Sequence, residues 1–226
     1  AVVPYYGYAR TDKKDQPRVP ITARLIADLL TVAGANRLLT VDLHAAQIQG
    51  FFNIPVDELT ALDILSSYFK KKKLDNLAVV ATDIGITKRA RDLAHKLNAP
   101  LAIMEKRRIG NKDQIETLNV IGEVKDKIAL TVDDEIDTAG SLVNTVATLI
   151  ERGAREVYAC CTHPVFSGDA IQRITSSPVK EVVVAGTIPV NKEKKLDKIT
   201  VLPIAPLLGE AIHRIHTGQS VGALFE

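Results

Sequence analysis

The sequence predicts an α/β protein with mainly parallel sheets. Short apolar segments alternate along the chain with longer amphipathic ones, which is the pattern of alternating strands and helices. The apolar segments are rich in Val, Leu and Ile and show little period-2 polarity, as expected for parallel strands that helices cover on both faces. The 226 residues, 46% of them hydrophobic, suffice to bury a substantial core.

The chain opens on an apolar segment, AVVPYYGYAR, that has the composition of a buried strand. Since no element precedes it and no Met begins it, we interpret the chain as lacking an upstream part. The first helix is expected over 20–34, with Pro20 in its first turn and Gly34 as its stop signal. Further helices are expected over 61–73, 87–98, 140–152 and 206–217, and strands over 37–41, 77–82, 127–132, 156–162 and 181–185.

A weak internal repeat favours two related halves. The pair Gly34-Ala35 closes a helix, a strand follows, and His44 comes next. At an offset of 119 residues, Gly153-Ala154 and His163 repeat this order. Duplication of an α/β unit explains the repeat, although so few matches can also arise by chance.

Charge and cysteine content narrow the class of protein. Lys plus Arg is 29 and Asp plus Glu is 27, a net charge of +2, which favours neither a nucleic-acid partner nor a membrane surface. No apolar run reaches the ~20 residues of a membrane span, and no signal peptide is visible. The only cysteines, Cys160 and Cys161, are adjacent in a strand and point to opposite faces. They suit a reducing compartment, so we expect a cytoplasmic protein.

The segment LTVDDEIDTAGS, residues 130–141, carries the strongest chemical signal. A buried strand ends in Asp133 and Asp134, and Asp137 precedes a turn of small residues that opens a helix. Ligands of open α/β sheets bind at the carboxyl ends of strands, and backbone N–H groups at a helix N-terminus bind phosphate. The carboxylates can accept hydrogen bonds from vicinal hydroxyls, so a ribose 5-phosphate moiety fits. The alternative is an N-capping turn with acidic residues near the helix dipole.

This segment resembles the phosphoribosyl-pyrophosphate loop of type I phosphoribosyltransferases. The rest of the chain is similar to the ribose-phosphate pyrophosphokinase family, and nearly its whole length carries the likeness. The DLH-to-IPVD stretch and the KRR segment are its most specific parts. The matching stretches are YARTDKKD (8–15), VDLHAAQIQGFFNIPVD (41–57), TDIGITKRA (82–90), EKRR (105–108), VDDEIDTAGS (132–141) and THPVFSG (162–168).

The resemblance implies two phosphoribosyltransferase-like domains, the first of them incomplete. Residues 1–56 would be the C-terminal part of the first domain, with 206–226 returning to it. Residues 57–205 would form the second domain, which carries the ribose 5-phosphate loop. The family has a further stretch upstream of the position of Ala1, and it assembles as homo-oligomers of the hexamer-of-dimers type.

The resemblance also implies the reaction. Members of the family transfer the β,γ-diphosphoryl group of ATP to the C1 hydroxyl of ribose 5-phosphate, releasing AMP and supplying nucleotide biosynthesis. Catalysis of this kind is mostly positioning and electrostatic stabilisation, with Mg²⁺ neutralising phosphate charge. By resemblance, His44 and Asp83 would be the residues associated with Mg²⁺.

The remaining roles are likewise implied by the resemblance. ATP would contact residues on two segments of the first domain, namely Arg10, Thr11, Lys13 and His44, whereas Lys14 reads equally well as part of a solvated turn. Lys106 and Arg108, on an expected mobile loop, would be catalytic and stabilise the transferring phosphoryl charge. Ribose 5-phosphate would bind Arg108, Asp133, Asp134, Asp137, Thr138, Ala139, Gly140 and Ser141.

Three positions depart from the family pattern. Ile86 stands where the family has a glycine that lets the backbone approach a phosphate closely. Thr11 replaces a Gln, and Gly222 replaces a Ser near the regulatory phosphate site. Two alternatives therefore stay open: a catalytically silent regulatory paralogue, and a nucleobase phosphoribosyltransferase, which would share the acidic loop but need neither the DLH nor the KRR segment.

Overall fold

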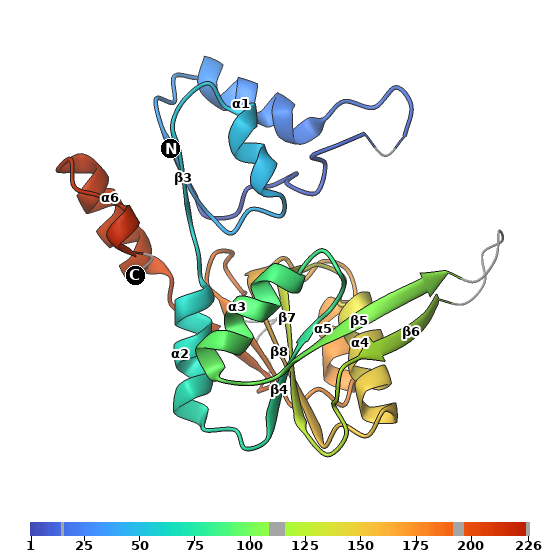
Figure 1. The fold of residues 1–226 in the computed structure, drawn as a ribbon. Coiled ribbons are helices and arrows are strands. Elements are labelled where there is room, and N and C mark those ends of the chain that lie inside the picture. The colour runs from blue at the N-terminus through green and yellow to red at the C-terminus, as the bar shows by residue number, and fades with distance from the viewer. Residues whose placement is uncertain (15, 109–115, 192–196, 225–226) are drawn as a thin grey trace. The chain divides into compact units, whose positions relative to one another are not determined.

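The computed structural model describes residues 1–14, 16–108, 116–191 and 197–224, and of residues 106–108 and 116–118 it describes the backbone alone. The chain forms two compact units (Figure 1). Unit 1 comprises Ala1–Ala61 and Pro203–Glu226, and unit 2 comprises Leu62–Leu202. The boundaries between the units thus lie a few residues away from the expected boundaries at 56/57 and 205/206.

Unit 1 is built on a small parallel sheet in the order β1-β2-β3. Its opening strand is shorter than expected, because only Val2–Val3 pair with the next strand. Val2 is exposed, so this strand is not the buried one that the composition predicts. A buried cluster that includes Tyr6, Ala23, Ala27 and Ile48 holds the first helix against the sheet. The elements are β1 Val2–Val3, α1 Thr22–Val32, β2 Leu38–Val41, η1 Ala46–Phe51, β3 Val56–Leu59, α6 Ala205–His216 and η3 Gly222–Leu224.

Unit 2 is a seven-stranded sheet in the order β10-β9-β8-β7-β4-β5-β6, parallel except for β6. The prediction of an α/β fold with mainly parallel sheets is confirmed. Its strands are β4 Leu77–Ala81, β5 Leu101–Arg108, β6 Glu116–Ile121, β7 Ile128–Ile136, β8 Glu156–Pro164, β9 Glu181–Ala185 and β10 Ile199–Leu202. Its helices are α2 Leu62–Lys72, α3 Thr87–Leu97, α4 Gly140–Glu151 and α5 Ala170–Ser176.

Helices cover both faces of this sheet, α2 and α3 on one side and α4 and α5 on the other (Figure 1). Strand β8 illustrates the result, because every residue from Val157 to Pro164 is buried. Cys161 belongs to the apolar cluster under α4 and α5, whereas Cys160 lies outside that cluster. The two thiols therefore face opposite sides, as the strand period requires.

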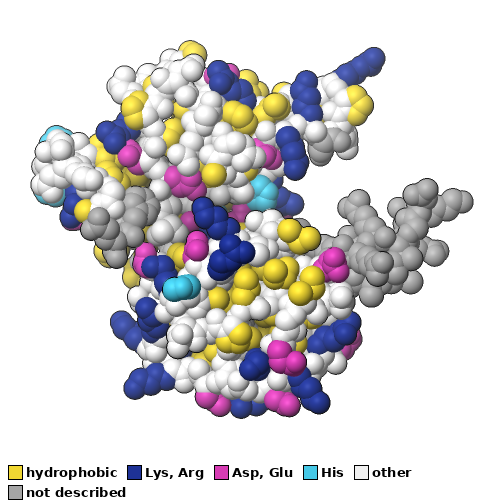
Figure 2. Space-filling model, viewed as in Figure 1, with side chains coloured by type: hydrophobic (Ala, Val, Ile, Leu, Met, Phe, Trp, Pro, Cys, Tyr) yellow, Lys and Arg dark blue, Asp and Glu magenta, His cyan; other side chains and the backbone are white. Residues whose placement is uncertain are grey.

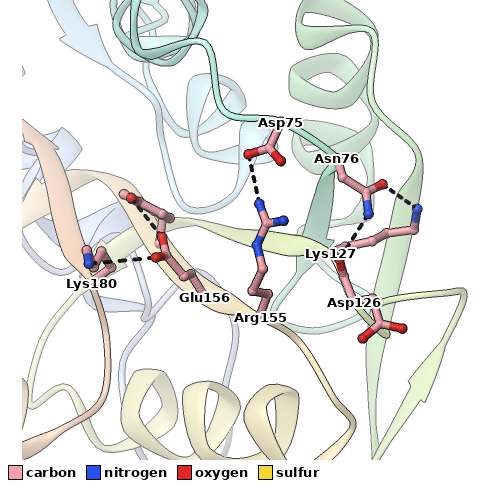
Figure 3. Close-up of polar contacts among 8 residues, drawn as sticks. Asp75, Asn76, Asp126, Lys127, Arg155, Glu156 and Lys180 are labelled. Atoms are coloured by element: carbon pink, nitrogen blue, oxygen red, sulfur yellow. Dashed lines mark hydrogen bonds and ion pairs between the residues drawn. The ribbon is translucent and has the colours of Figure 1, made fainter.

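Charged side chains at the amino ends of the strands have charged or polar partners there (Figure 3). Arg155, just before β8, donates to Asp75 at 2.7 Å, and Lys127, just before β7, donates to Asn76 at 3.0 Å. Lys180 lies 3.7 Å from Glu156. Since parallel strands begin at one edge and end at the other, these pairs mark the edge of the sheet opposite the strand ends that carry the acidic loop.

A second polar cluster, centred on the buried Glu181, ties α2 to strands β8, β9 and β10. Lys72 lies 2.8 Å from one carboxylate oxygen of Glu181, and the hydroxyls of Tyr68 and Thr200 donate to the other at 2.6 Å each. The Lys72 ammonium also lies 5.5 Å from the ring centroids of Tyr68 and Tyr158, which is within cation–π range. This cluster joins elements distant in sequence and so contributes to the stability of unit 2.

Side chains of both charge signs are intermixed over the face shown in Figure 2, in keeping with the near-neutral net charge. In the part of the chain that the structure describes, no helix has the length and apolar character needed to cross a bilayer.

Candidate active site

Asp133 and Asp134 lie inside β7, because this strand continues to Ile136, whereas Asp137 follows the strand. Asp133 pairs in register with Cys161 of β8, and Thr82 follows the neighbouring strand β4. The Thr82 hydroxyl donates to Oδ2 of Asp133 at 2.8 Å, and the backbone N–H of Asp134 donates to its Oδ1 at 2.9 Å. The site therefore sits at the carboxyl edge of the sheet, where ligands of α/β proteins bind.

The pKa of Asp133 is raised to about 8, chiefly by burial and then by the adjacent Asp134, while the Thr82 hydrogen bond acts in the opposite direction. Among the residues that the structure describes, no Lys or Arg forms an ion pair with Asp133. This contrasts with the paired charges at the opposite edge. Two carboxyls packed so closely favour sharing a proton, and they can both donate and accept hydrogen bonds.

The turn after β7 presents backbone N–H groups at the start of α4. Ala139 precedes the helix with a left-handed φ of 59°, and no side chain caps the helix. Thr138 and Ser141 are exposed, so their hydroxyls can reach a ligand. A Cβ built on Gly140 would lie 3.3 Å from Nη1 of Arg173, which shows how closely this turn is surrounded. Such a helix N-terminus favours an anion.

Asp83 follows β4 at the same edge of unit 2 and is exposed. Its Oδ1 accepts a hydrogen bond from the backbone N–H of Ile86 at 3.1 Å. Ile86 has φ −88°, a conformation open to any residue, so isoleucine causes no backbone strain where the family has glycine. Ile84 at the tip is 70% exposed. The Ile86 N–H is therefore engaged within the chain.

In unit 1, His44 is exposed directly after a rigid turn at the end of β2. The turn contains Asp42 with φ 43°, whose Oδ2 accepts from the N–H of Ala61 at 2.9 Å. The N–H of Leu43 donates to Glu58 at 2.8 Å. These bonds fix the backbone on which the imidazole is carried.

Arg10 and Lys13 are also exposed in unit 1, on the irregular segment after β1. The hydroxyl of Thr11 donates to the carbonyl of Tyr8 at 2.7 Å, and its N–H donates to the same oxygen at 2.9 Å. The Thr11 hydroxyl thus uses its proton to stabilise the turn that begins at Tyr8. Only the lone pairs of the hydroxyl oxygen stay available, as acceptors for a ligand.

The expectation that the backbone at Lys106 and Arg108 forms a loop is wrong. Both residues lie on strand β5, which forms an antiparallel hairpin with β6, and Lys106 pairs in register with Leu118. Edge hairpins do not need apolar side chains, so the polar sequence did not reveal a strand. The side chains of Lys106 and Arg108 lie outside the described residues, as does the rest of the segment to residue 115.

Within unit 2 the structure brings together the residues that follow β4, the two aspartates inside β7 and the turn into α4. The other candidates, Arg10, Thr11, Lys13 and His44, belong to unit 1. Three contacts were missed by the sequence analysis: the bond of Thr82 to Asp133, that of Ser167 to Asp137, and that of Arg173 to Thr138. The hydroxyl of Thr82 at a strand end was a usable signal, whereas the other two partners depend on how α5 packs.

Comparison with known proteins covers the whole chain. The family model described as phosphoribosyl synthetase-associated domain matches residues 107–226, and the N-terminal domain of ribose phosphate pyrophosphokinase matches residues 1–34. The chain is 58% identical over 226 residues to the ribose-phosphate pyrophosphokinase of Caldanaerobacter subterraneus subsp. tengcongensis, covering all of this chain and 71% of that protein. The protein of the same name from Bacillus caldolyticus is 53% identical over 225 residues, again at 100% and 71% coverage.

A solved structure indicates the same family as these relatives. The phosphoribosylpyrophosphate synthetase from Mycobacterium smegmatis superposes with a TM-score of 0.90 at 41% identity, covering 96% of this chain and 71% of that one. The matches define an enzyme of the phosphoribosyl pyrophosphate synthetase class, built on an α/β fold. The chain belongs to the ribose-phosphate pyrophosphokinase family.

Proposed function

We propose that the acidic strand end and the turn into α4 hold ribose 5-phosphate for the reaction of this family, the transfer of a diphosphoryl group from ATP to the C1 hydroxyl, giving phosphoribosyl pyrophosphate and AMP. The observation that carries the proposal is the juxtaposition of two features. A preformed helix N-terminus suits a phosphate, and two adjacent carboxyls, Asp134 buried and Asp133 partly buried, lie a few residues before it on β7.

Asp133 and Asp134 are assigned to the ribose hydroxyls. Because the pKa of Asp133 is raised by burial and by Asp134, the pair can hold one proton near neutral pH. It then offers one donor and several acceptors, which matches a vicinal diol whose hydroxyls also both donate and accept. Residues 138–141 are assigned to the 5-phosphate through their backbone N–H groups and hydroxyls, and Asp137 through its backbone N–H.

Mg²⁺ would be held in large part by substrate phosphates and water, as is usual for this ion. Asp83 fits such a site, because it is exposed at a strand end. Among the described residues, only one of its carboxylate oxygens, Oδ1, accepts a hydrogen bond, from the N–H of Ile86. His44 is assigned to the same chemistry through the likeness to the family. Among the described residues, no group of three or more metal-ligating side chains occurs, so substrate oxygens would have to complete the coordination. When bound, the ion neutralises phosphate charge.

Arg10, Thr11 and Lys13 are assigned to ATP, and Lys106 and Arg108 to the transferring phosphoryl charge, all through likeness to the family. A compact ammonium and a forked guanidinium serve this purpose in different ways: the first acts as a point charge, and the second can hold two oxygens at once. Homo-oligomeric assembly and a cytoplasmic location are proposed on the same basis, and light scattering of the purified chain tests the assembly.

Isothermal titration calorimetry with three ligands tests the sugar-phosphate site. Ribose 5-phosphate should bind more tightly than ribose, which lacks the phosphate, and more tightly than 2-deoxyribose 5-phosphate, which lacks one of the two hydroxyls. Replacing Asp133 by Asn should weaken the preference for ribose 5-phosphate over its deoxy analogue and leave the preference for the phosphate in place. Equal binding of ribose and ribose 5-phosphate would place the phosphate site elsewhere.

A further inference from the structure

The turn that begins α4 is held from behind by residues 166–173, which lead into α5 and form its first half. The N–H of Phe166 donates to the carbonyl of Ile136 at 3.0 Å, and the N–H of Ser167 donates to the carbonyl of Asp137 at 3.1 Å. Arg173 Nη1 donates to the carbonyl of Thr138 at 3.1 Å. Three successive carbonyl oxygens, from the end of β7 into the turn, are thus bound by residues 166–173, which lie beside α4 because α4 and α5 pack together (Figure 1).

These three bonds fix where the following N–H groups point. In a planar trans peptide the C=O and the N–H of the next residue point in opposite directions. A donor that holds the carbonyl of Thr138 therefore turns the N–H of Ala139 away from Arg173. The bonds to Ile136 and Asp137 likewise turn the N–H groups of Asp137 and Thr138 away from the 166–173 segment.

The turn needs such external support. Ala139 has a left-handed φ of 59°, which L-residues adopt only when their surroundings hold them there, and the helix has no side-chain cap. Phe166, on the supporting side, is itself left-handed with φ 47° and is 1% exposed, so it is locked by packing. The Ser167 hydroxyl adds a hydrogen bond to the Asp137 carboxylate.

We propose that Arg173 is a positioning residue for ribose 5-phosphate: it holds the Thr138 carbonyl so that the Ala139 N–H faces the phosphate. The inference rests on the proposed function, since it takes the turn to be the phosphate site. Arg173 is exposed on a short helix and lies against Gly140, so its loss removes an orienting contact without opening the core.

The test compares three variants of the full chain by calorimetry with ribose 5-phosphate and by ¹⁵N–¹H correlation spectra. Arg173→Met should bind ribose 5-phosphate about tenfold more weakly, the equivalent of about 1.4 kcal/mol. Arg173→Lys can still donate to one carbonyl and should recover most of the affinity. Arg152→Met removes another exposed arginine, at the far end of α4, and should bind like the wild type. The ligand-induced shift of the Ala139 amide should shrink in Arg173→Met alone.

The outcomes separate the two claims. If the wild type binds ribose 5-phosphate and Arg173→Met binds it equally well with an unchanged Ala139 shift, Arg173 has no positioning role. If the lysine variant is as weak as the methionine variant although both melt normally, orientation by a donated hydrogen bond is also wrong. If the wild type shows no shift at 138–141 on addition of ribose 5-phosphate, both the proposed phosphate site and this inference are overturned.

Discussion

The hydroxyl of Thr82, directly after β4, and the carboxylate of Asp133, inside the neighbouring parallel strand β7, are joined by a hydrogen bond of 2.8 Å. The bond acts on a carboxyl that is otherwise poorly solvated. It lowers the pKa of Asp133, but burial and the neighbouring Asp134 outweigh it. The net result is an aspartic acid that holds its proton up to about pH 8, at the position where the sugar hydroxyls are proposed to bind.

This raised pKa predicts how stability depends on pH. The ordinary pKa of an aspartate side chain is 3.8, whereas Asp133 in the folded chain titrates at about 8. Between these values the folded chain binds more protons than the unfolded chain, so the free energy of unfolding should fall as pH rises and level off above about 8. The slope for one proton is at most about 1.4 kcal/mol per pH unit.

Urea unfolding without Mg²⁺ at pH 5, 6, 7 and 8 measures this effect. Asp133→Asn has no titrating group at position 133, so its free energy of unfolding should vary less between pH 5 and 8. Its stability relative to the wild type should therefore increase as pH rises. Parallel curves for the two proteins would show that Asp133 is ionised throughout.

Gly140→Val should weaken ribose 5-phosphate binding about tenfold or more, because side-chain atoms would crowd the N–H groups of the turn. The fold should survive, since the nearest atom to the new Cβ is the end of the exposed Arg173 side chain. Gly209→Val in α6, where a Cβ meets nothing within 4 Å, is the matched control. Calorimetry that finds the same affinity in both variants would contradict the assignment of the phosphate to this turn.

Lys106→Ala should lower kcat by about 10²–10³ while substrate affinity and the melting temperature stay near their wild-type values. A charge contact that forms mainly in the transition state has this signature. Arg108→Ala should slow the reaction too and also lose some sugar-phosphate affinity. Release of AMP from ATP and ribose 5-phosphate is the assay, with Lys71→Ala on the exposed end of α2 as control. An undiminished kcat in Lys106→Ala would remove this residue from catalysis.

Lys72→Met should destabilise unit 2 by about 1–3 kcal/mol, because Glu181 would keep its buried carboxylate without a cation. Burial acts to raise the pKa of Glu181, but hydrogen bonds from Lys72, Thr200 and Tyr68 hold it below its ordinary value. Lys70→Met, two residues earlier and exposed, should change stability little. Equal urea midpoints for both variants would mean that the Lys72–Glu181 pair contributes nothing.

The strongly periodic parts of the fold were predictable. The expected helices 87–98 and 140–152 end within one residue of α3 and α4, because the apolar period and local stop signals define them. Gly34 and Gly153, which follow helices, have φ of 100° and 86°, as glycine stop signals require. The acidic loop was likewise visible, since three aspartates and a run of small residues stand together in the sequence.

The remaining elements depended on tertiary contacts. Strand β5 continues through the charged residues Glu105 to Arg108 because β6 pairs with it, and no local pattern distinguishes this from a loop. Arg173 shows the same limit at the site. It is an ordinary exposed arginine on a seven-residue helix, and only the packing of α5 beside α4 brings it to Thr138. The individual roles of the site residues stay predictions.

The adjacent cysteines of β8 provide a built-in reporter of how the central sheet opens. Burial raises the pKa of Cys160 to about 12 and that of Cys161 well above its ordinary value, so neither thiol reacts while the sheet is closed. An alkylating reagent can therefore modify them only when β8 separates from its neighbours or from the helices above and below. Because the two side chains face opposite helix layers, the order in which they are modified would reveal which layer detaches first.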